Sequence, residues 1–374
     1  MDVDAPLPLL GGLSPQAFMR RHWQRRPLLV RQAMPGVAPP VSRAALFALA
    51  ADEAVESRLV RRDGDRWTLR RGPLPRRALP AVATPGWTLL VQGLDLQLDA
   101  AHALLSAFRF LPQARLDDLM VSWASDGGGV GPHLDSYDVF LLQVQGRRRW
   151  RIGRVDRPTW QPDAPLKLLH DFRPDQDLLL EPGDLLYLPP GWGHDGVAEG
   201  ECMTCSIGFR APRPTELARE LLLRLADAID PPDDEPLYRD AGEPATDRPG
   251  RVPDRLLAHA RAAVQRALDS SGAVEQALGE WLTEPKPTVF FEPGASWPPG
   301  TGLRLDRRSR LMYDGRRLFF NGEAFLVGGR DAQLLRRLAD RGGLSPREAA
   351  GFSAEARAQL DDWVAAGWLQ AAAP

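Results

Sequence analysis

The chain has 374 residues, enough for two or three domains that each bury a core. It is 44% hydrophobic and 26% charged, as ordinary globular proteins are, and no apolar run reaches the roughly 18 residues of a membrane span. A formal net charge of −2 gives the whole molecule no electrostatic reason to bind nucleic acid or an anionic membrane. No basic segment followed by an apolar one marks a signal peptide, so we expect a cytoplasmic protein without a membrane partner.

The first third of the chain mixes helical and strand patterns. Ser14 is the predicted N-cap of a short helix that Pro15 opens, and the apolar run Leu28–Val30 predicts a strand. A second strand is expected at Trp87–Gln92, before an amphipathic stretch from Leu96 to Phe108.

Short apolar runs separated by glycine and proline fill the segment from Leu116 to Arg210. Short strands at regular spacing are typical of an antiparallel sandwich or barrel rather than of an alternating β/α fold. The predicted strands are Leu119–Ala124, Val139–Val144, Arg149–Ile152, Leu178–Glu181, Leu185–Leu188 and Met203–Phe209.

The two cysteines, Cys202 and Cys205, form a C-x-x-C pair. Such a pair can serve redox or zinc chemistry, but a zinc site needs a second pair or histidines at fixed spacing. On an extended strand the two positions lie on opposite faces, because the side-chain period is two. We therefore expect reduced, structural thiols.

Helical patterns replace the strands after Pro212. Apolar stripes predict amphipathic helices over 217–225 and 256–268, separated by a proline- and acid-rich loop between Pro231 and Pro253. The stripes predict a helical region at residues 212–284 through which the chain forms a homodimer.

The last ninety or so residues combine strands and short helices in the manner of a winged-helix domain, expected at residues 285–374. No lysine- or arginine-rich recognition helix stands out, so we expect packing or protein contacts and no direct DNA binding. The predicted strands lie near 288–292, 303–306 and 311–327, with turns at Asp314-Gly315 and Asn321-Gly322, and the predicted helices lie at about 331–341, 346–351 and 354–366.

The residues that carry chemistry lie in the strand-rich segment. His133 and Asp135 follow the glycine-rich run Gly127–Pro132 and are two positions apart, so on an extended chain their side chains share one face. A third ligand is expected from His194, which follows an apolar strand and a Pro-Pro-Gly turn. Two histidines and a carboxylate on one face of an octahedral ion are typical of non-haem Fe(II) oxygenases. The competing interpretation is that both histidines are ordinary turn or core residues.

Four segments together resemble the JmjC-type, cupin-like ribosomal oxygenases, most closely the bacterial ribosomal-protein arginine hydroxylases. They are Gly127–Phe140, Gly146–Arg151, Glu181–Gly191 and Ser206–Pro212, and weaker similarity extends towards both ends of the chain. The resemblance implies an α+β fold: a double-stranded β-helix (jelly-roll or cupin) JmjC domain at residues 1–211, then the helical dimerisation region and the winged-helix-like domain.

The resemblance also implies the ligands of the site. His133, Asp135 and His194 are implied to bind Fe(II), with 2-oxoglutarate as cosubstrate and O2 as oxidant. Arg148 matches the family's arginine that holds the distal carboxylate of 2-oxoglutarate. Strand parity agrees, because Arg148 shares a face with Trp150 while its arginine neighbours take the opposite, solvent-facing side.

Hydroxyl groups on neighbouring strands are candidates to complete the cosubstrate site, or else line the barrel. These are Ser122, Thr204 and Ser206. Family members carry Asn-Tyr-Ser where this chain has Thr204-Cys205-Ser206, a departure at residue 204.

Tyr137 and Asp118 are the candidates for substrate binding. Tyr137 shares parity with His133 and Asp135, and Asp118 shares parity with Ser122 on the preceding strand. A carboxylate and an aromatic face suit an arginine side chain, although Tyr137 could equally be core and Asp118 a strand-start hydrogen-bond acceptor. By resemblance, the substrate is an arginine β-carbon in the sixteenth large-subunit ribosomal protein.

Three other functions remain open on the sequence. The chain could be a ribosomal oxygenase that hydroxylates histidine, or a non-oxygenase metal cupin such as an isomerase or a sugar-binding protein. It could also be a regulator that binds DNA through the C-terminal domain, against which the net charge of −2 argues.

Overall fold

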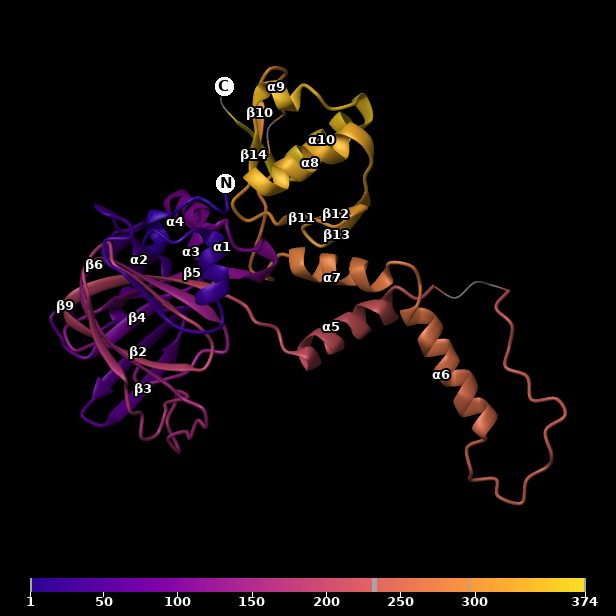
Figure 1. Cartoon of the computed structure of the whole chain (residues 1–374), viewed down its shortest axis with the longest axis horizontal. Helices are drawn as coiled ribbons and strands as arrows, with labels where there is room; N and C mark the ends of the chain where they lie inside the picture. Colours follow the sequence, from indigo (N-terminus) through magenta and orange to yellow (C-terminus); the bar gives the residue numbers. More distant parts are fainter. Residues whose placement is uncertain (1, 231–233, 295, 373–374) are drawn as a thin grey trace. The chain divides into compact units, whose positions relative to one another are not determined.

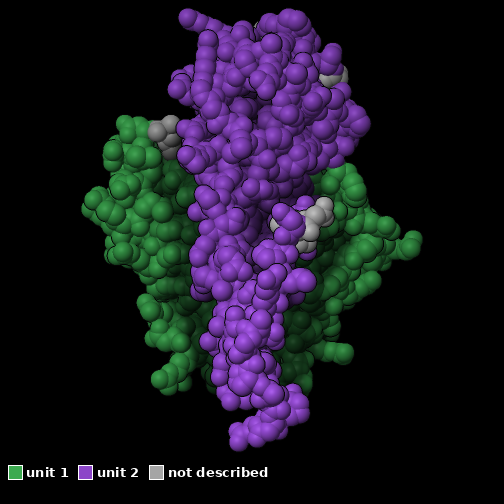
Figure 2. Space-filling model, turned by 90° about the vertical axis from the view of Figure 1, so that its right-hand side faces the viewer, with its two compact units in different colours: residues 1–211, 287–290 green, residues 212–286, 291–374 purple. Residues whose placement is uncertain are grey.

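The computed structural model describes residues 2–230, 234–294 and 296–372 (Figure 1). The chain divides into two compact units, residues 1–211 with 287–290 and residues 212–286 with 291–374 (Figure 2). The helical region predicted at 212–284 shares the second unit with the C-terminal strands and helices, so its separate role stays a prediction.

A nine-stranded sheet, antiparallel throughout its pairings, makes up most of the first unit. The strand order is β1-β8-β6-β9-β5-β4-β2-β3, and β7 pairs with β6. This agrees with the antiparallel β architecture predicted for 116–210. The strands are β1 (Leu28–Val30), β2 (Ser57–Asp63), β3 (Arg66–Arg71), β4 (Trp87–Val91), β5 (Leu116–Ala124), β6 (Asp138–Arg154), β7 (Gln176–Leu180), β8 (Leu185–Leu188) and β9 (Trp192–Phe209).

Strand β6 carries a bulge that decides which of its residues face inwards. Its pairing with β9 shifts register between Gln143 and Gln145 and again before Arg147. Gly146 permits the bulge with a φ of 62°. Leu141 before the bulge and Trp150 after it belong to the same buried cluster, so the inward face changes from odd to even positions. The runs predicted at 139–144 and 149–152 are therefore one continuous strand.

Short helices cover one side of this sheet (Figure 1). Ser14 caps α1 as predicted, its Oγ accepting a hydrogen bond from the Ala17 amide at 3.2 Å. Phe18 of α1 packs on Phe140 and Tyr187 of the sheet, with ring centroids 5.7 and 5.0 Å away. The helices are η1 (Pro8–Leu10), α1 (Pro15–Arg21), α2 (Arg43–Leu49), η2 (Arg76–Ala78), α3 (Leu94–Gln97), α4 (Asp99–Leu105), η3 (Ser106–Phe108) and η4 (Gln113–Arg115).

The two cysteines lie on opposite faces of β9, as predicted. Both thiols are free and buried. Cys202 packs with Ala124 and Ala198, whereas Cys205 belongs to the main core. Burial raises the pKa of the Cys205 thiol to about 12, so it stays protonated and unreactive at neutral pH.

The described part of the second unit contains three helices followed by two three-stranded sheets, β14-β10-β15 and β11-β12-β13, with three further helices. The predicted Asn321-Gly322 turn joins β12 to β13, and both residues take the positive φ (49° and 93°) that two-residue hairpin turns require. The elements are α5 (Pro214–Asp227), α6 (Asp254–Leu268), α7 (Ala273–Thr283), β10 (Gly302–Leu305), β11 (Leu311–Tyr313), β12 (Arg317–Phe320), β13 (Glu323–Leu326), α8 (Gly329–Arg341), β14 (Gly343–Leu344), α9 (Pro346–Ala349), α10 (Ala354–Ala365) and β15 (Leu369–Ala372).

One predicted strand is wrong. Residues 288–292 form no strand, because Pro285, Pro287 and Pro293 remove backbone donors on both sides of this short apolar run. Residues 231–233 of the loop predicted after Pro231 lie outside the described residues. Among the described helices, none has the length and hydropathy needed to cross a membrane.

Candidate metal centre

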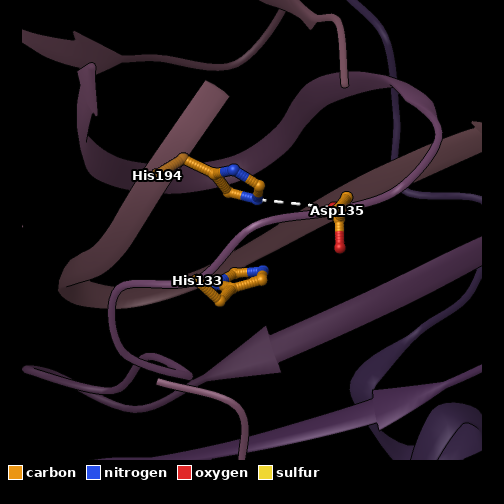
Figure 3. A group of neighbouring side chains, drawn as sticks. All are labelled: His133, Asp135 and His194. Carbon is orange, nitrogen blue, oxygen red and sulfur yellow. Dashed lines mark ion pairs between the residues drawn. The ribbon is translucent and has the colours of Figure 1, made fainter. Parts of the chain in front are cut away.

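His133, Asp135 and His194 converge on one point (Figure 3). Each offers a ligand atom, and these atoms lie within 4.8 Å of one another. The Nε2 atom of His194 is 3.5 Å from Asp135 Oδ2, and the two imidazole centroids are 4.2 Å apart. The backbones of His133 and His194 exchange two hydrogen bonds of 3.0 Å, which brings the β5–β6 loop beside the start of β9.

The expected extended strand through residues 133–137 is not present. Strand β6 begins at Asp138, and before it only His133 takes part in a bridge. Asp135 and Tyr137 therefore reach the site from a loop, so period-two parity was the wrong reason for grouping them with His133.

Backbone carbonyls fix the orientation of both imidazoles. His133 Nδ1 lies 2.8 Å from the Gly131 carbonyl and His194 Nδ1 lies 3.1 Å from the Trp192 carbonyl. Because a carbonyl only accepts, each Nδ1 carries the proton and each Nε2 keeps its lone pair for a metal. Gly131 has a φ of 78°, and a Cβ there would approach Leu168 to 2.8 Å, so this turn needs glycine.

Burial and mutual contact set the charge of the three ligands. Burial lowers the pKa of His133 to about 4, so its imidazole is neutral at physiological pH. Burial opposes ionisation of Asp135, yet its contacts with His194 and His133 lower its pKa to about 2. Burial likewise opposes protonation of His194, but Asp135 raises its pKa. A neutral imidazole and a carboxylate are the forms that bind a divalent metal, and a set of two nitrogens and one oxygen suits Fe(II).

A cavity of about 280 Å³ adjoins the triad and brings most of the predicted site residues together. It is lined by Arg148, Ser122, Ser206, Asp118 and Tyr137 among others. Thr204 is fully buried and reaches the site through Arg148, to which its Oγ1 lies 3.5 Å away.

Arg148 is the buried cation of the cavity, with 2% of its surface exposed. Its Nη1 donates to Ser122 Oγ at 2.9 Å and its Nη2 donates to the Gly196 carbonyl at 3.4 Å. Its Nε is buried without a hydrogen-bond partner, and no carboxylate in the described part of the chain lies within ion-pair distance. A buried charge that makes no ion pair is costly, so this guanidinium fits an anionic ligand, and its planar fork suits a carboxylate.

The cavity lining also contains the predicted substrate residues, Asp118 and Tyr137, and two residues to which the sequence analysis gave no role, Arg58 and Gln92. Asp118 is 5% exposed, and its Oδ2 accepts from the Gly93 amide at 3.1 Å and from Gln92 Nε2 at 3.5 Å. Arg58 Nη2 donates to Gln92 Oε1 at 2.7 Å, which turns the Gln92 amide towards Asp118. Gln92 ends the strand predicted at Trp87–Gln92, whereas Arg58 lies on a hairpin, β2–β3, that the sequence analysis did not predict.

Comparison with known proteins supports this assignment. The JmjC domain family matches residues 103–217, and the ROXA-like winged helix matches residues 265–370. The ribosomal protein uL16 3-hydroxylase of Escherichia coli K12 is 41% identical over 213 residues, 57% of this chain and 56% of that protein. A probable ribosomal oxygenase of Haemophilus influenzae is 36% identical over 209 residues, 55% of this chain and 52% of that protein. These alignments thus span little more than half of each relative.

Solved structures match over nearly the whole length. The X-ray structure of E. coli YcfD has a TM-score of 0.82 at 30% identity and covers 94% of this chain and 96% of that one. A second structure is that of YcfD, a ribosomal oxygenase from E. coli, in complex with cobalt and 2-oxoglutarate. It has a TM-score of 0.80 at 30% identity, and the match covers 96% of this chain and 98% of that one. These matches confirm the predicted fold class, a JmjC cupin-like domain followed by helices and a winged helix. The chain belongs to the JmjC ribosomal oxygenase family.

Proposed function

We propose that this chain is an Fe(II)- and 2-oxoglutarate-dependent oxygenase that hydroxylates the β-carbon of an arginine in a large-subunit ribosomal protein of the uL16 type. The observation that carries the proposal is Arg148: a buried guanidinium without a carboxylate partner in the described chain, lining the same cavity as the His133–Asp135–His194 triad. A metal isomerase or sugar-binding cupin has no need of a cation for a dicarboxylate, so Arg148 favours the oxygenase over that alternative.

Each residue of the site has a defined part in the proposed reaction. His133, Asp135 and His194 would hold the iron through two imidazole nitrogens and one carboxylate oxygen. Arg148 and Ser122 hold the distal carboxylate of 2-oxoglutarate. Together, bound iron and 2-oxoglutarate supply the oxidative chemistry, in which O2 converts the cosubstrate to succinate and CO2 and one oxygen atom enters a substrate C–H bond.

The substrate end of the cavity supports an arginine target. Asp118 supplies a buried carboxylate for a guanidinium, and Tyr137 supplies an aromatic face in the same cavity. The E. coli relative, named a uL16 3-hydroxylase, acts on a ribosomal protein. We therefore also propose a cytoplasmic enzyme, since a ribosomal-protein substrate is available where ribosomes assemble.

We also propose a homodimer and no direct DNA binding. Leucines of α5 and α6, including Leu223 and Leu257, are about half exposed and form apolar stripes that a second copy can cover. Arginines of α8 in the winged helix make contacts within their own unit: Arg336 donates to the Gly315 carbonyl, and Arg341 pairs with Glu348. Those contacts compete with phosphate binding.

The test of the activity uses the full chain with Fe(II), 2-oxoglutarate and purified uL16. We expect succinate formation that depends on uL16, and mass spectrometry should find one added oxygen on an arginine. The His133→Ala variant is the control and should form neither product. If the oxygen is found on histidine, the chain joins the histidine-hydroxylating members of the family; if no 2-oxoglutarate is consumed with uL16 or any ribosomal protein, the proposed function is wrong.

A further inference from the structure

Gln143 lies on β6 immediately before the bulge and is completely buried. Its Nε2 donates to the carbonyls of Gln145 and Gly146, at 2.8 and 3.2 Å. Both carbonyls belong to the bulge, where the regular ladder with β9 is interrupted. The amide group of Gln143 is therefore held in one orientation, with its NH2 on the bulge and its Oε1 on the other side.

Thr204, opposite Gln143 on β9, continues this directed set of hydrogen bonds. Its hydroxyl donates to Gln143 Oε1 at 2.8 Å. Since a hydroxyl has a single proton, Thr204 Oγ1 can only accept from Arg148 Nη1, which lies 3.5 Å away. Ser122 Oγ accepts from the same Nη1 at 2.9 Å.

The consequence for Arg148 is a defined orientation. Its Nη1 is directed to Thr204 and Ser122 and its Nη2 to the Gly196 carbonyl, while its buried Nε has no partner. Fixing a long, flexible side chain before a ligand arrives removes the entropy cost of ordering it on binding. In the described structure Gln143 is not among the residues that line the cavity, so it acts only through its neighbours.

We propose that Gln143 is a positioning residue for the anionic ligand of the cavity: through Thr204 it holds the Arg148 guanidinium in the orientation that receives the distal carboxylate of 2-oxoglutarate. This inference rests on the proposed function, because that function identifies the ligand. Thr204 suits this role because its single hydroxyl both donates to Gln143 and accepts from Arg148.

The experiment measures 2-oxoglutarate binding without turnover, by isothermal titration calorimetry on the full chain loaded with Mn(II). Gln143→Leu removes the amide at similar volume, and Thr204→Val removes the hydroxyl without changing shape. We expect each to weaken 2-oxoglutarate binding by roughly five- to tenfold, the effect of about one hydrogen bond, with Mn(II) affinity unchanged. Thr204→Ser restores the hydroxyl and should bind as the wild type does.

A double-variant cycle separates positioning from general loss of structure. Because both residues act along one path, Gln143→Leu/Thr204→Val should bind no more weakly than the weaker single variant. Thr88→Val is the matched control: Thr88 is a fully buried threonine on β4 whose Oγ1 donates to the Gly129 carbonyl at 3.3 Å, and its loss should leave 2-oxoglutarate affinity unchanged.

The outcomes are distinguishable. If the wild type does not bind 2-oxoglutarate at all, the proposed function is wrong. If the wild type binds it and Gln143→Leu binds equally well, or the two losses add in the double variant, the positioning role of Gln143 is wrong. A parallel loss of Mn(II) affinity in Gln143→Leu would likewise contradict it. Should that variant not fold, Gln143→Asn, which keeps the amide but is too short to reach Thr204, must show the same selective loss.

Discussion

Replacing Arg148 with methionine should leave the protein about as stable as the wild type but unable to bind its cosubstrate. Arg148 is 2% exposed, and no acid in the described chain pairs with it. Methionine keeps an unbranched apolar stem of similar reach and removes the charge. Cosubstrate binding should therefore be lost without a loss of stability, which a merely damaged site would not produce.

The contacts of Arg148 determine the size of the change in stability and of the loss of 2-oxoglutarate binding. A buried ion without a partner costs several kcal/mol. Against this, the variant loses the 2.9 Å bond to Ser122, the longer bonds to Thr204 (3.5 Å) and to the Gly196 carbonyl (3.4 Å), and the cation–π contact with Trp150, 5.2 Å away, together worth about 4 kcal/mol. The two contributions nearly cancel, so the melting temperature without ligand should stay within a few degrees of that of the wild type. Losing two charge-assisted bonds to the carboxylate should weaken 2-oxoglutarate binding at least about a hundredfold.

The assay is thermal unfolding with and without 2-oxoglutarate, in the presence of Mn(II), together with calorimetric titration. Arg149→Met is the matched control, because Arg149 is the next residue on β6, faces the opposite way and pairs with Asp177 and Glu199. It should bind 2-oxoglutarate as the wild type does. If Arg148→Met melts far below the wild type without ligand, the premise of a costly buried charge is wrong; if it retains 2-oxoglutarate affinity, the cosubstrate assignment of Arg148 is wrong.

Three further results are expected. Asp135→Asn should abolish Fe(II) binding, measured by titration with a metal indicator, because a neutral amide replaces the anionic ligand; normal metal affinity would contradict the triad. Asp118→Asn should lower kcat/KM for uL16 by roughly tenfold or more while 2-oxoglutarate affinity stays unchanged, since a buried charge-assisted contact is lost only at the substrate end. Leu257→Glu, on the exposed apolar stripe of α6, should convert a dimer to a monomer in light scattering without lowering the melting temperature of the first unit; an unchanged mass would place the interface elsewhere.

Local sequence patterns predicted the structure correctly where residues close in the chain determine it. Ser14 and Pro15 specify a helix start through one hydrogen bond within a turn, and Asn321-Gly322 specifies a hairpin turn through backbone angles that few residues adopt. The inward face of Arg148 was also predictable, because Trp150 and Ile152 follow it on the same side of the bulge and share its parity.

Pairing between strands far apart in the chain determined the features that the sequence analysis missed. The bulge of β6 places the even-numbered Arg148 on the same inward face as the odd-numbered Leu141. It arises from the register against β9, about fifty residues along the chain, and no local sequence pattern encodes it. Hairpin β2–β3 was missed because arginines occupy positions on both of its faces and hide the alternation. The run at 288–292 is apolar enough for a strand, but prolines deny it the hydrogen bonds that a partner would need.

Residue types and their spacing therefore identified His133, Asp135 and His194 as a candidate set, since metal ligands are few and chemically distinctive. Only the tertiary structure could show that the loop before β6 and the first residues of β9 lie side by side, and that Gln143 and Thr204 meet behind Arg148. The physical reason is that side-chain chemistry belongs to single residues, whereas orientation in a buried site depends on strand register, which is a property of the whole sheet.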